Sequence, residues 1–402
     1  MPPKISHASS HTKLNATMTR YVEEIEMTSG NQGSATKDPS LLKLGGAPRP
    51  DLPSLANETA TDVERLCADL ERDAMKGLWT VQGRSEALSD IRPHVWTWKK
   101  IQAYLDRAGS AMSLEDSPVR RALMLWNPGA KDHWDATNTL TAAVQMMLPG
   151  EQVITHRHIH SALRFITHGR GATTTVNGGK ITLSAGDLVL TPNWAWHDHS
   201  NESDEPIIWM DGVDRPLVKM LDAVYFEVYQ NHGYQPVVKN EHEAGFQTDL
   251  DGLDLSRYSP KLVYRWEEAE RALDHLEAQN DISPYDDVLF KYSNPINGGP
   301  ITPTMGADIQ RLRPGVHTRA HRHTNSAVYH VYRGSGHSII DGERFDWEEG
   351  DYFVLPSRVW HEHVNDSKTH AAVLFSINDR PAYESLGLYR EEALTTGNGF
   401  QS

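Results

Sequence analysis

The 402-residue chain has one cysteine, Cys67, so it cannot form an internal disulfide framework and is compatible with a reducing compartment. It has no run of about 18 apolar residues, the length that a membrane-spanning helix needs. Its N-terminus also lacks the apolar core of a signal peptide. These absences predict a cytoplasmic protein that has no membrane partner.

Positive charge is also scarce, with 39 Lys and Arg against 54 Asp and Glu, and a formal net charge of −15. Binding to nucleic acid depends on Lys and Arg that neutralise phosphates. We therefore expect no nucleic-acid partner. The same imbalance means that an anionic substrate would need positive charge placed locally at its site.

A histidine pattern stands out between residues 150 and 201. His156 and His158 are two apart in a β-type run, so both side chains leave the same face of a strand. His197 follows about forty residues later, and three such imidazoles can close on one metal ion. The spacing Gly-x5-His-x-His, then Gly-x5-Pro-x4-His-x3-Asn, resembles the double motif of cupins. Ala162 stands where cupins normally carry a glutamate ligand.

The same pattern returns in the second half of the chain. His321, His323 and His361 repeat the three histidines at offsets of 165, 165 and 164 residues. Ala327 stands at the glutamate position of this second copy, as Ala162 does in the first. A nearly constant offset indicates an internal duplication. The sequence therefore predicts a mainly β bicupin, with two tandem double-stranded β-helix (jelly-roll) barrels and flanking helices.

The duplication divides the chain into five predicted segments. They are a disordered N-terminal tail over 1–58, a helical extension over 59–118, a catalytic N-terminal cupin barrel with a trailing helix over 119–230, a linker with a helix over 231–284, and a C-terminal cupin barrel over 285–402. The tail is rich in Ser, Thr, Gly and Pro, and such a segment buries too little apolar surface to fold.

Hydrophobic periodicity predicts four helices outside the barrels, over residues 61–76, 98–107, 216–229 and 266–278. In the first, Thr61 and Glu64 form a capping box, and one stripe is predicted to be buried: Val63, Leu66, Cys67 and Leu70. The second helix is predicted to end at Gly109. The third carries an apolar stripe of Leu217, Met220, Leu221 and Val224.

Arg164 is the most informative charged residue. It lies two residues after Ala162 and shares its inward parity, so we expect its side chain inside the first barrel near the metal. A buried guanidinium needs a partner, and a substrate carboxylate would accept two parallel hydrogen bonds from it. The alternative is a structural ion pair with Asp211 or Asp198. In the second copy the position is Tyr329, which predicts ring chemistry in the first barrel alone.

Other side chains complete the predicted pocket. Three neutral imidazoles leave a metal with open positions and a net positive charge, which favours anionic ligands. His199 alternates with His197, so it faces inward, where it could move a proton or orient its neighbours. Gln145 and Asp211 are further pocket residues. His321, His323 and His361 form a second candidate metal site that we expect to contribute no ring cleavage.

From about residue 75 to 390, the sequence resembles gentisate 1,2-dioxygenases. The resemblance rests on specific strings: LWNPG at 125–129, LPGE followed by HRH-x3-ALRF, TP-x-W-x-WHDH, IIWMDG, HRHTNSAVYHV and LGLYRE. It implies cleavage of gentisate (2,5-dihydroxybenzoate) to maleylpyruvate with Fe(II) and O2, in the catabolism of aromatic compounds. The implied partners are a small aromatic hydroxy-carboxylate, O2, and further copies of the chain in a homodimer or homotetramer.

The resemblance also assigns residues. It implies His156, His158 and His197 as iron ligands and Arg164 as the group that holds the substrate carboxylate. Other matched pocket positions are Arg120, Gln145, His199 and Asp211. Thr141 departs from the family, because many relatives have an aromatic residue there.

Several alternatives stay open. The small Thr141 side chain could widen the pocket, so salicylate and 1-hydroxy-2-naphthoate are alternative substrates. A metal-binding bicupin without turnover is another alternative, although it would not need an arginine in only one copy. An oxalate-type decarboxylase or isomerase would usually keep the glutamate ligand that Ala162 and Ala327 replace.

Overall fold

The computed structural model describes residues 60–81, 90–112, 121–131, 133–229, 233–250 and 252–401. Its contacts divide the chain into two units, residues 1–89 and 90–402, which are described separately. The predicted tail over 1–58, the side chain of Thr61 and the predicted pocket residue Arg120 lie outside the described residues. None of the described helices is long and apolar enough to cross a membrane.

In the first unit, the structure describes helices α2 (Ala60–Arg72) and α3 (Leu78–Val81). The predicted helix over 61–76 is present but ends earlier, and Ala74 takes a left-handed φ of 55°. The predicted burial of its stripe is wrong, because Val63 and Leu66 are 44% and 46% exposed. The described part of this unit has only a four-residue second helix, which is too short to cover that stripe.

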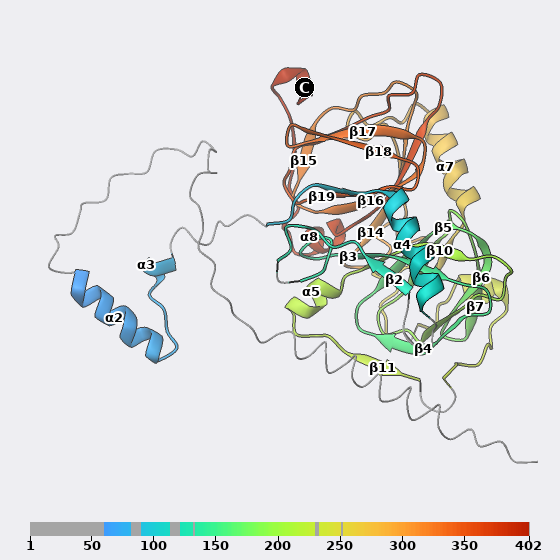
Figure 1. Ribbon diagram of the computed structural model, residues 1–402, viewed down its shortest axis with the longest axis horizontal. Coiled ribbons are helices and arrows are strands. Elements are labelled where there is room, and N and C mark those ends of the chain that lie inside the picture. Colours follow the sequence, from blue (N-terminus) through green and yellow to red (C-terminus); the bar gives the residue numbers. More distant parts are fainter. Residues whose placement is uncertain are drawn as a thin grey trace, which may run out of the picture. The chain divides into compact units, whose positions relative to one another are not determined.

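The second unit contains two barrels, and the first is made of two antiparallel sheets (Figure 1). The six-stranded sheet has the order β12 (Val263–Tyr264), β8 (Leu188–Thr191), β5 (Ala162–His168), β10 (Ile207–Val213), β3 (Thr141–Met147) and β2 (Arg121–Met124). The five-stranded sheet has the order β11 (Phe226–Val228), β4 (Gln152–His158), β9 (His197–Ser200), β6 (Arg170–Val176) and β7 (Gly179–Ser184).

The second barrel repeats this plan. Its six-stranded sheet has the order β1 (His94–Trp96), β19 (Tyr352–Leu355), β16 (Ala327–Arg333), β21 (Ala372–Asn378), β14 (Gly306–Leu312) and β13 (Val288–Lys291). Its five-stranded sheet has the order β18 (Glu343–Glu348), β17 (Ser335–Ile340), β20 (His361–Val364), β15 (His321–His323) and β22 (Glu391–Ala393). The predicted mainly β bicupin is confirmed.

The two six-stranded sheets pack against each other, which explains why β3 and β21 are buried along their whole length. An alternating strand would expose one face to water, but here the other barrel covers it. Phe165 of β5 stacks on Phe375 of β21, with ring centroids 3.9 Å apart. Gly212 leaves room for Ile377, whose Cδ1 would lie 2.3 Å from a Cβ at that position. The shared core therefore fixes one barrel against the other.

The barrels also exchange their entry strands. β1 precedes the first barrel in the chain but pairs with β19 of the second, and β12 precedes the second barrel but pairs with β8 of the first. The helix that follows each exchanged strand is also bound to the barrel that the strand joins. Trp98 N, at the start of the helix after β1, donates to Asp351 Oδ1 of the second barrel at 2.7 Å. Trp266 N, at the start of the helix after β12, donates to Asp187 Oδ1 of the first barrel at 3.1 Å. A carboxylate at a helix N-terminus is electrostatically favoured.

Two of the predicted flanking helices are confirmed, one with the predicted bounds and one that is longer than predicted. α7 (Trp266–Ala278) has the predicted limits. α4 (Trp98–Ala111) runs past Gly109, so the prediction that Gly109 ends the helix is wrong. A Cβ on Gly109 would lie 2.9 Å from Met146 Cε, so the glycine provides a close approach between α4 and β3.

The predicted helix over 216–229 is wrong in its second half. α5 (Arg215–Met220) is short, Asp222 takes a φ of 51°, and the chain then forms β11 at the edge of β4. Leu221 is 69% exposed, so the apolar stripe is not buried as a helix face. Short helices α6 (Glu241–Gly245) and α8 (Arg380–Ser385) and the 3-10 turn η1 (Gly397–Gly399) complete the described elements.

A reciprocal pair of hydrogen bonds joins the barrels. Thr139 of the first half donates to Asp379 of the second, and Thr304 of the second half donates to Asp214 of the first at 2.5 Å. Each carboxylate also accepts a main-chain bond, from Ser161 N to Asp214 and from Ser326 N to Asp379. Burial raises the pKa of Asp214 and of Asp379 to about 6.

We predict that Thr139→Val destabilises the protein more at pH 7.5 than at pH 5. Burial raises the folded-state pKa of Asp379, so folding favours its protonated form and loses stability as pH rises through about 6. The Thr139 hydroxyl opposes that loss by bonding to the ionised carboxylate. Its removal should cost roughly 1–3 kcal/mol above that pH and less below it. Thermal unfolding at both pH values checks this, with Thr304→Val as the matched variant. Equal penalties at both pH values would contradict it.

Candidate active site

The structure brings the three predicted ligands of the first barrel together. β4 carries His156 and His158, β9 carries His197, and His156 lies directly opposite His197 in the sheet. The ring centroids are 4.3 Å apart for His156 and His197, and 4.7 Å apart for His158 and His197. The three ligand nitrogens lie within 4.8 Å of one another, and all three side chains are buried.

The tautomer of each imidazole is set by the main chain. Each Nδ1 is within hydrogen-bond distance of a carbonyl oxygen: Ile154 at 2.8 Å for His156, His160 at 2.7 Å for His158, and Ala195 at 3.0 Å for His197. A donating Nδ1–H leaves Nε2 with the lone pair, as in most metal-binding histidines. The Nε2 of His197 is buried and has no hydrogen-bond partner among the described residues. This donor set therefore fits a divalent metal ion.

Burial favours the neutral form of His197. Burial lowers the pKa of His197 well below its usual value, and the neighbouring His156 and His158 lower it further. A neutral imidazole is the form that binds metal. Ala162, at the glutamate position, is buried in β5 and contributes no ligand. Three neutral nitrogens suit Fe(II), zinc, nickel or manganese, with further coordination positions left for substrate.

Arg164 is inside the first barrel, as its parity predicted, and is only 1% exposed. Of the two acidic partners that the sequence offered as alternatives, the structure pairs Arg164 with Asp211. Asp211 lies directly opposite Arg164 in the register between β5 and β10, and its Oδ1 is 3.0 Å from Arg164 Nε. Arg164 Nη1 also donates to Thr191 Oγ1 at 2.5 Å. The alternative partner Asp198 bonds to Thr155 instead.

Two further predicted pocket residues, His199 and Gln145, are buried in the first barrel. His199 is 1% exposed, and its ring lies 5.9 Å from that of His197. Its Nδ1 is hydrogen-bonded to Thr174 Oγ1, which fixes the ring. Gln145 on β3 is also 1% exposed, and its Nε2 has no hydrogen-bond partner in the described part of the chain. A buried, unpaired amide N–H2 is suited to a ligand oxygen.

Sequence reasoning missed three residues that support this pocket. Thr174 orients His199, Thr191 contacts Arg164, and Trp209 Nε1 donates to Asp211 Oδ2 at 3.0 Å. Trp209 had a usable signal, since it lies two residues before Asp211 on the same strand face. Thr141 is buried and bonds to Asp135, so its hydroxyl is already used by the protein.

The second barrel has a similar triad but a different interior. The ring centroids of His321 and His361 are 4.3 Å apart, and those of His323 and His361 are 4.9 Å apart. Tyr329, at the position of Arg164, stacks on Phe353 with centroids 4.6 Å apart. The residue opposite Tyr329 is Ser376, where the first barrel has Asp211. The second barrel therefore has the three histidines without the buried ion pair.

Comparison with known proteins places these features in a family. The cupin domain family matches residues 143–213 and 308–378. The chain is 35% identical over 341 residues to 5-aminosalicylate 1,2-dioxygenase of a Comamonas species, covering 83% of this chain and 91% of that protein. It is 36% identical over 348 residues to gentisate 1,2-dioxygenase 1 of Aquipseudomonas alcaligenes, covering 84% and 99%.

A solved structure of a related dioxygenase is similar to this chain along most of its length. A variant of salicylate 1,2-dioxygenase from Pseudoaminobacter salicylatoxidans, crystallised with gentisate, is similar to this chain with a TM-score of 0.76 and 30% identity. The match covers 85% of this chain and 98% of that one. The similarity therefore extends over both barrels and not only over the histidine motifs.

We predict that His197→Ala removes the metal from the first triad, because two imidazoles remain of three. The measurement is metal content after anaerobic Fe(II) loading, in a His361→Ala background that also breaks the second triad. The expected result is a fall from about one ion per chain to nearly none, with the fold retained. His275→Ala, which changes an exposed histidine of α7, is the control. Full metal content in the His197→Ala variant would remove this triad as the site.

Proposed function

This chain is a member of the ring-cleaving 1,2-dioxygenase family that includes the gentisate 1,2-dioxygenases, and from that premise we propose gentisate as its substrate. In the proposed reaction Fe(II) and O2 cleave the ring between the carboxylate-bearing carbon and its hydroxylated neighbour, giving maleylpyruvate. The observation that carries the proposal is Arg164, a buried guanidinium in the first barrel, where the second barrel has Tyr329.

The charge at the site supports an anionic aromatic ligand. Three neutral imidazoles leave a divalent ion with its full charge of two. The Arg164–Asp211 ion pair adds no net charge to the site. A hydroxybenzoate with its carboxylate and adjacent phenol ionised would balance that charge. A guanidinium presents its N–H donors in a planar fork that matches the two oxygens of a carboxylate. Arg164 can therefore bind a carboxylate by a charge-assisted, bidentate contact while Asp211 holds it in place.

Each pocket residue has a role in the proposed reaction. Bound Fe(II) would supply open coordination positions and the electrons that make O2 reactive. Gln145 would donate its buried amide N–H to a substrate oxygen. His199, fixed by Thr174, would take up and return the proton of a ring hydroxyl. Trp209 and Asp211 would keep the Arg164 fork aimed into the pocket.

The substrate is the finer part of the proposal. Thr141 is a small residue on β3, in the strand that also carries Gln145, so substrates broader than gentisate stay as alternatives: salicylate, 5-aminosalicylate and 1-hydroxy-2-naphthoate. A bicupin without turnover is disfavoured, because a buried ion pair is costly to form and only one barrel has it. Iron as the metal, a homo-oligomeric state and a cytoplasmic location are parts of the same proposal.

The test is oxygen uptake by protein that has been reconstituted anaerobically with Fe(II). Gentisate, salicylate and 1-hydroxy-2-naphthoate are supplied in separate assays, and products are identified by mass spectrometry. The proposal predicts the highest kcat/KM with gentisate and a product that contains both atoms of O2. Faster turnover of another of these acids would reassign the substrate. No uptake with any of them by iron-loaded protein would overturn the dioxygenase proposal for this chain.

We predict that Arg164→Lys raises the KM for gentisate by roughly thirtyfold or more. Lysine keeps the positive charge beside Asp211 but loses the planar fork, and a lost charge-assisted contact costs on the order of 2 kcal/mol. Steady-state oxygen uptake measures the effect. Arg157→Lys is the matched control, since Arg157 lies between two ligands but pairs with Glu227 at 2.8 Å. An unchanged KM in the Arg164 variant would rule out the carboxylate clamp.

A further inference from the structure

The second histidine triad has one contact that the first lacks. Glu391 Oε1 lies 3.1 Å from His321 Nδ1, whereas the corresponding His156 Nδ1 faces the main-chain oxygen of Ile154. Glu391 begins β22, which pairs with β15 so that Glu391 lies opposite His323. The first barrel has the same edge strand, β11, in the same register, with Phe226 opposite His158. The duplicated position is therefore a carboxylate in one barrel and a phenyl ring in the other.

This exchange changes what each triad does to a metal ion. Phe226 stacks on His156, with centroids 5.4 Å apart, and leaves the first triad neutral. A carboxylate behind a ligating imidazole makes the ring a stronger base and orients it. It also reduces the net charge of a triad with a divalent ion from two to one. The second triad is thus built to hold its ion more firmly and to attract anionic ligands less.

The interior of the second barrel carries larger side chains than the first at two matched positions. Phe353 stands at the position of Val189, and Trp347 at that of Leu183, both at an offset of 164 residues. Trp347 Nε1 donates to Ser338 Oγ at 3.0 Å, and Ser338 bonds to His363 Nδ1 at 2.8 Å. These aromatic rings occupy space and provide no cation for a carboxylate. The second triad is therefore unsuited to an aromatic acid.

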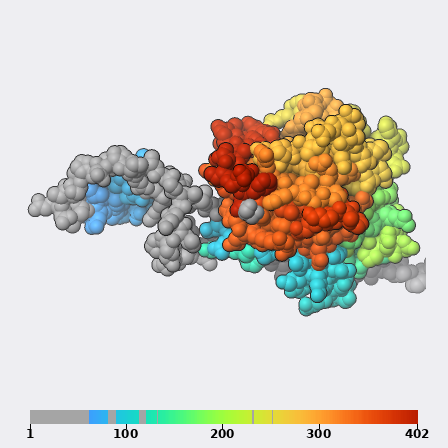
Figure 2. Space-filling model, turned by 90° about the horizontal axis from the view of Figure 1, so that it is seen from above, coloured from blue at the N-terminus to red at the C-terminus, as the bar shows by residue number. Residues whose placement is uncertain are grey.

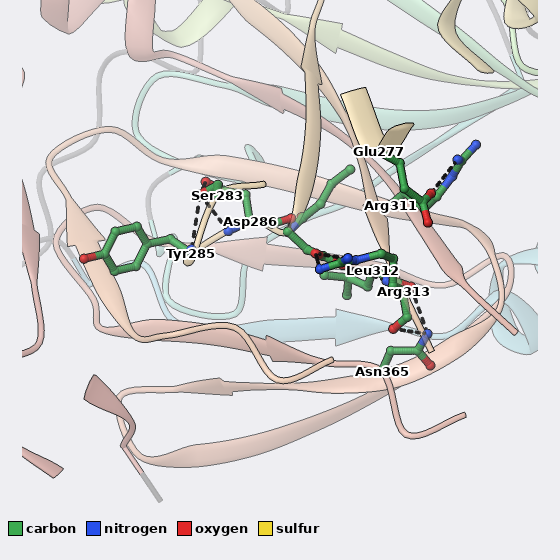
Figure 3. Close-up of polar contacts among 10 residues, drawn as sticks. Glu277, Ser283, Tyr285, Asp286, Arg311, Leu312, Arg313 and Asn365 are labelled. Carbon is green, nitrogen blue, oxygen red and sulfur yellow. Dashed lines mark hydrogen bonds and ion pairs between the residues drawn. The ribbon is translucent and has the colours of Figure 1, made fainter. Parts of the chain in front are cut away.

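Residues next to the second triad contact the C-terminal end of the chain. His321 stacks on Tyr285, with centroids 4.9 Å apart, and Figure 3 shows Tyr285 extending from the turn in which Ser283 bonds to Asp286. Beyond β22, Ala320 N donates to Gly399 O at 2.7 Å and Gln401 N donates to Glu362 Oε2 at 2.9 Å. Figure 2 shows the red C-terminal residues lying on the orange surface of the second barrel.

We propose that His321, His323 and His361, with Glu391 behind His321, form a structural site for a divalent transition-metal ion of the zinc or iron class. The ion fixes His321, and through Glu391 it fixes strand β22 and the C-terminal segment, residues 386–401, on the second barrel. This inference goes beyond the proposed ring cleavage and does not depend on it. The first triad serves chemistry, and the second serves the attachment of the chain end.

Zinc binding to a single remaining triad tests the proposal. In a His197→Ala background, titration of metal-free protein with Zn(II) reports the second site. Removing a carboxylate that orients a metal ligand costs about 10- to 100-fold in affinity, so Glu391→Gln should raise the Kd by about tenfold or more. Tyr389→Phe is the matched control, because Tyr389 Oη donates only to the other carboxylate oxygen of Glu391. A Glu391→Gln affinity equal to that of the control would refute the role of Glu391.

Hydrogen exchange supplies a readout that is independent of activity and uses the otherwise unaltered chain. Zn(II) should slow the exchange of the β22 amides at least severalfold in the wild-type protein and leave it unchanged in His361→Ala, which keeps the first triad. Equal β22 exchange with and without Zn(II) in the wild type would overturn the attachment role. Ring-cleavage activity in Glu391→Gln is measured as well, because activity that persists there while zinc affinity falls would show that the second site does not take part in ring cleavage.

Discussion

Arg164 is a full positive charge with 1% of its surface exposed, and the design of the first barrel depends on that fact. An isolated buried guanidinium is costly, so the barrel must supply partners for it. Asp211 lies opposite in the sheet, Trp209 holds Asp211 from the other side, and Thr191 accepts a further bond. Together they keep a cation next to three neutral imidazoles that already favour an anion. This arrangement is the basis of the proposal that the first barrel selects a ligand that carries a carboxylate.

The duplication explains how one chain can hold such a site rigidly. The exchanged strands β1 and β12, the Thr–Asp bonds and the stacked Phe165 and Phe375 make each barrel part of the support of the other. The second barrel therefore still supports the first, although it has no counterpart of the Arg164–Asp211 pair. Tyr329 and Phe353 fill its interior, and Glu391 ties its histidines to the end of the chain. In the roles proposed above, divergence of the two copies separates a reactive site from a supporting one.

The features that could be predicted from the sequence depend on short-range periodicity. Two-residue alternation placed His156, His158, Arg164 and His199 inside the barrel, and the constant offset identified the bicupin. The sequence left Asp211 and Asp198 open as acidic partners of Arg164, because strand register across the sheet decides between them and parity alone does not. β11 was taken for helix because its preceding apolar residues have helical spacing, while the free edge of β4 provides a strand partner. Glu391 ends the string LGLYRE, but its contact was missed because it is 70 residues from His321 and nothing in that string indicates a histidine partner.

The central claim is that the first barrel recognises its substrate through the carboxylate. The most direct measurement compares oxygen uptake by the Fe(II)-loaded enzyme with gentisate and with its methyl ester, which keeps the ring and both hydroxyls but carries no charge on the acid group. The account predicts that the ester has a kcat/KM lower by roughly thirtyfold or more, the loss expected from a charge-assisted contact. Equal kcat/KM for the acid and the ester would contradict it.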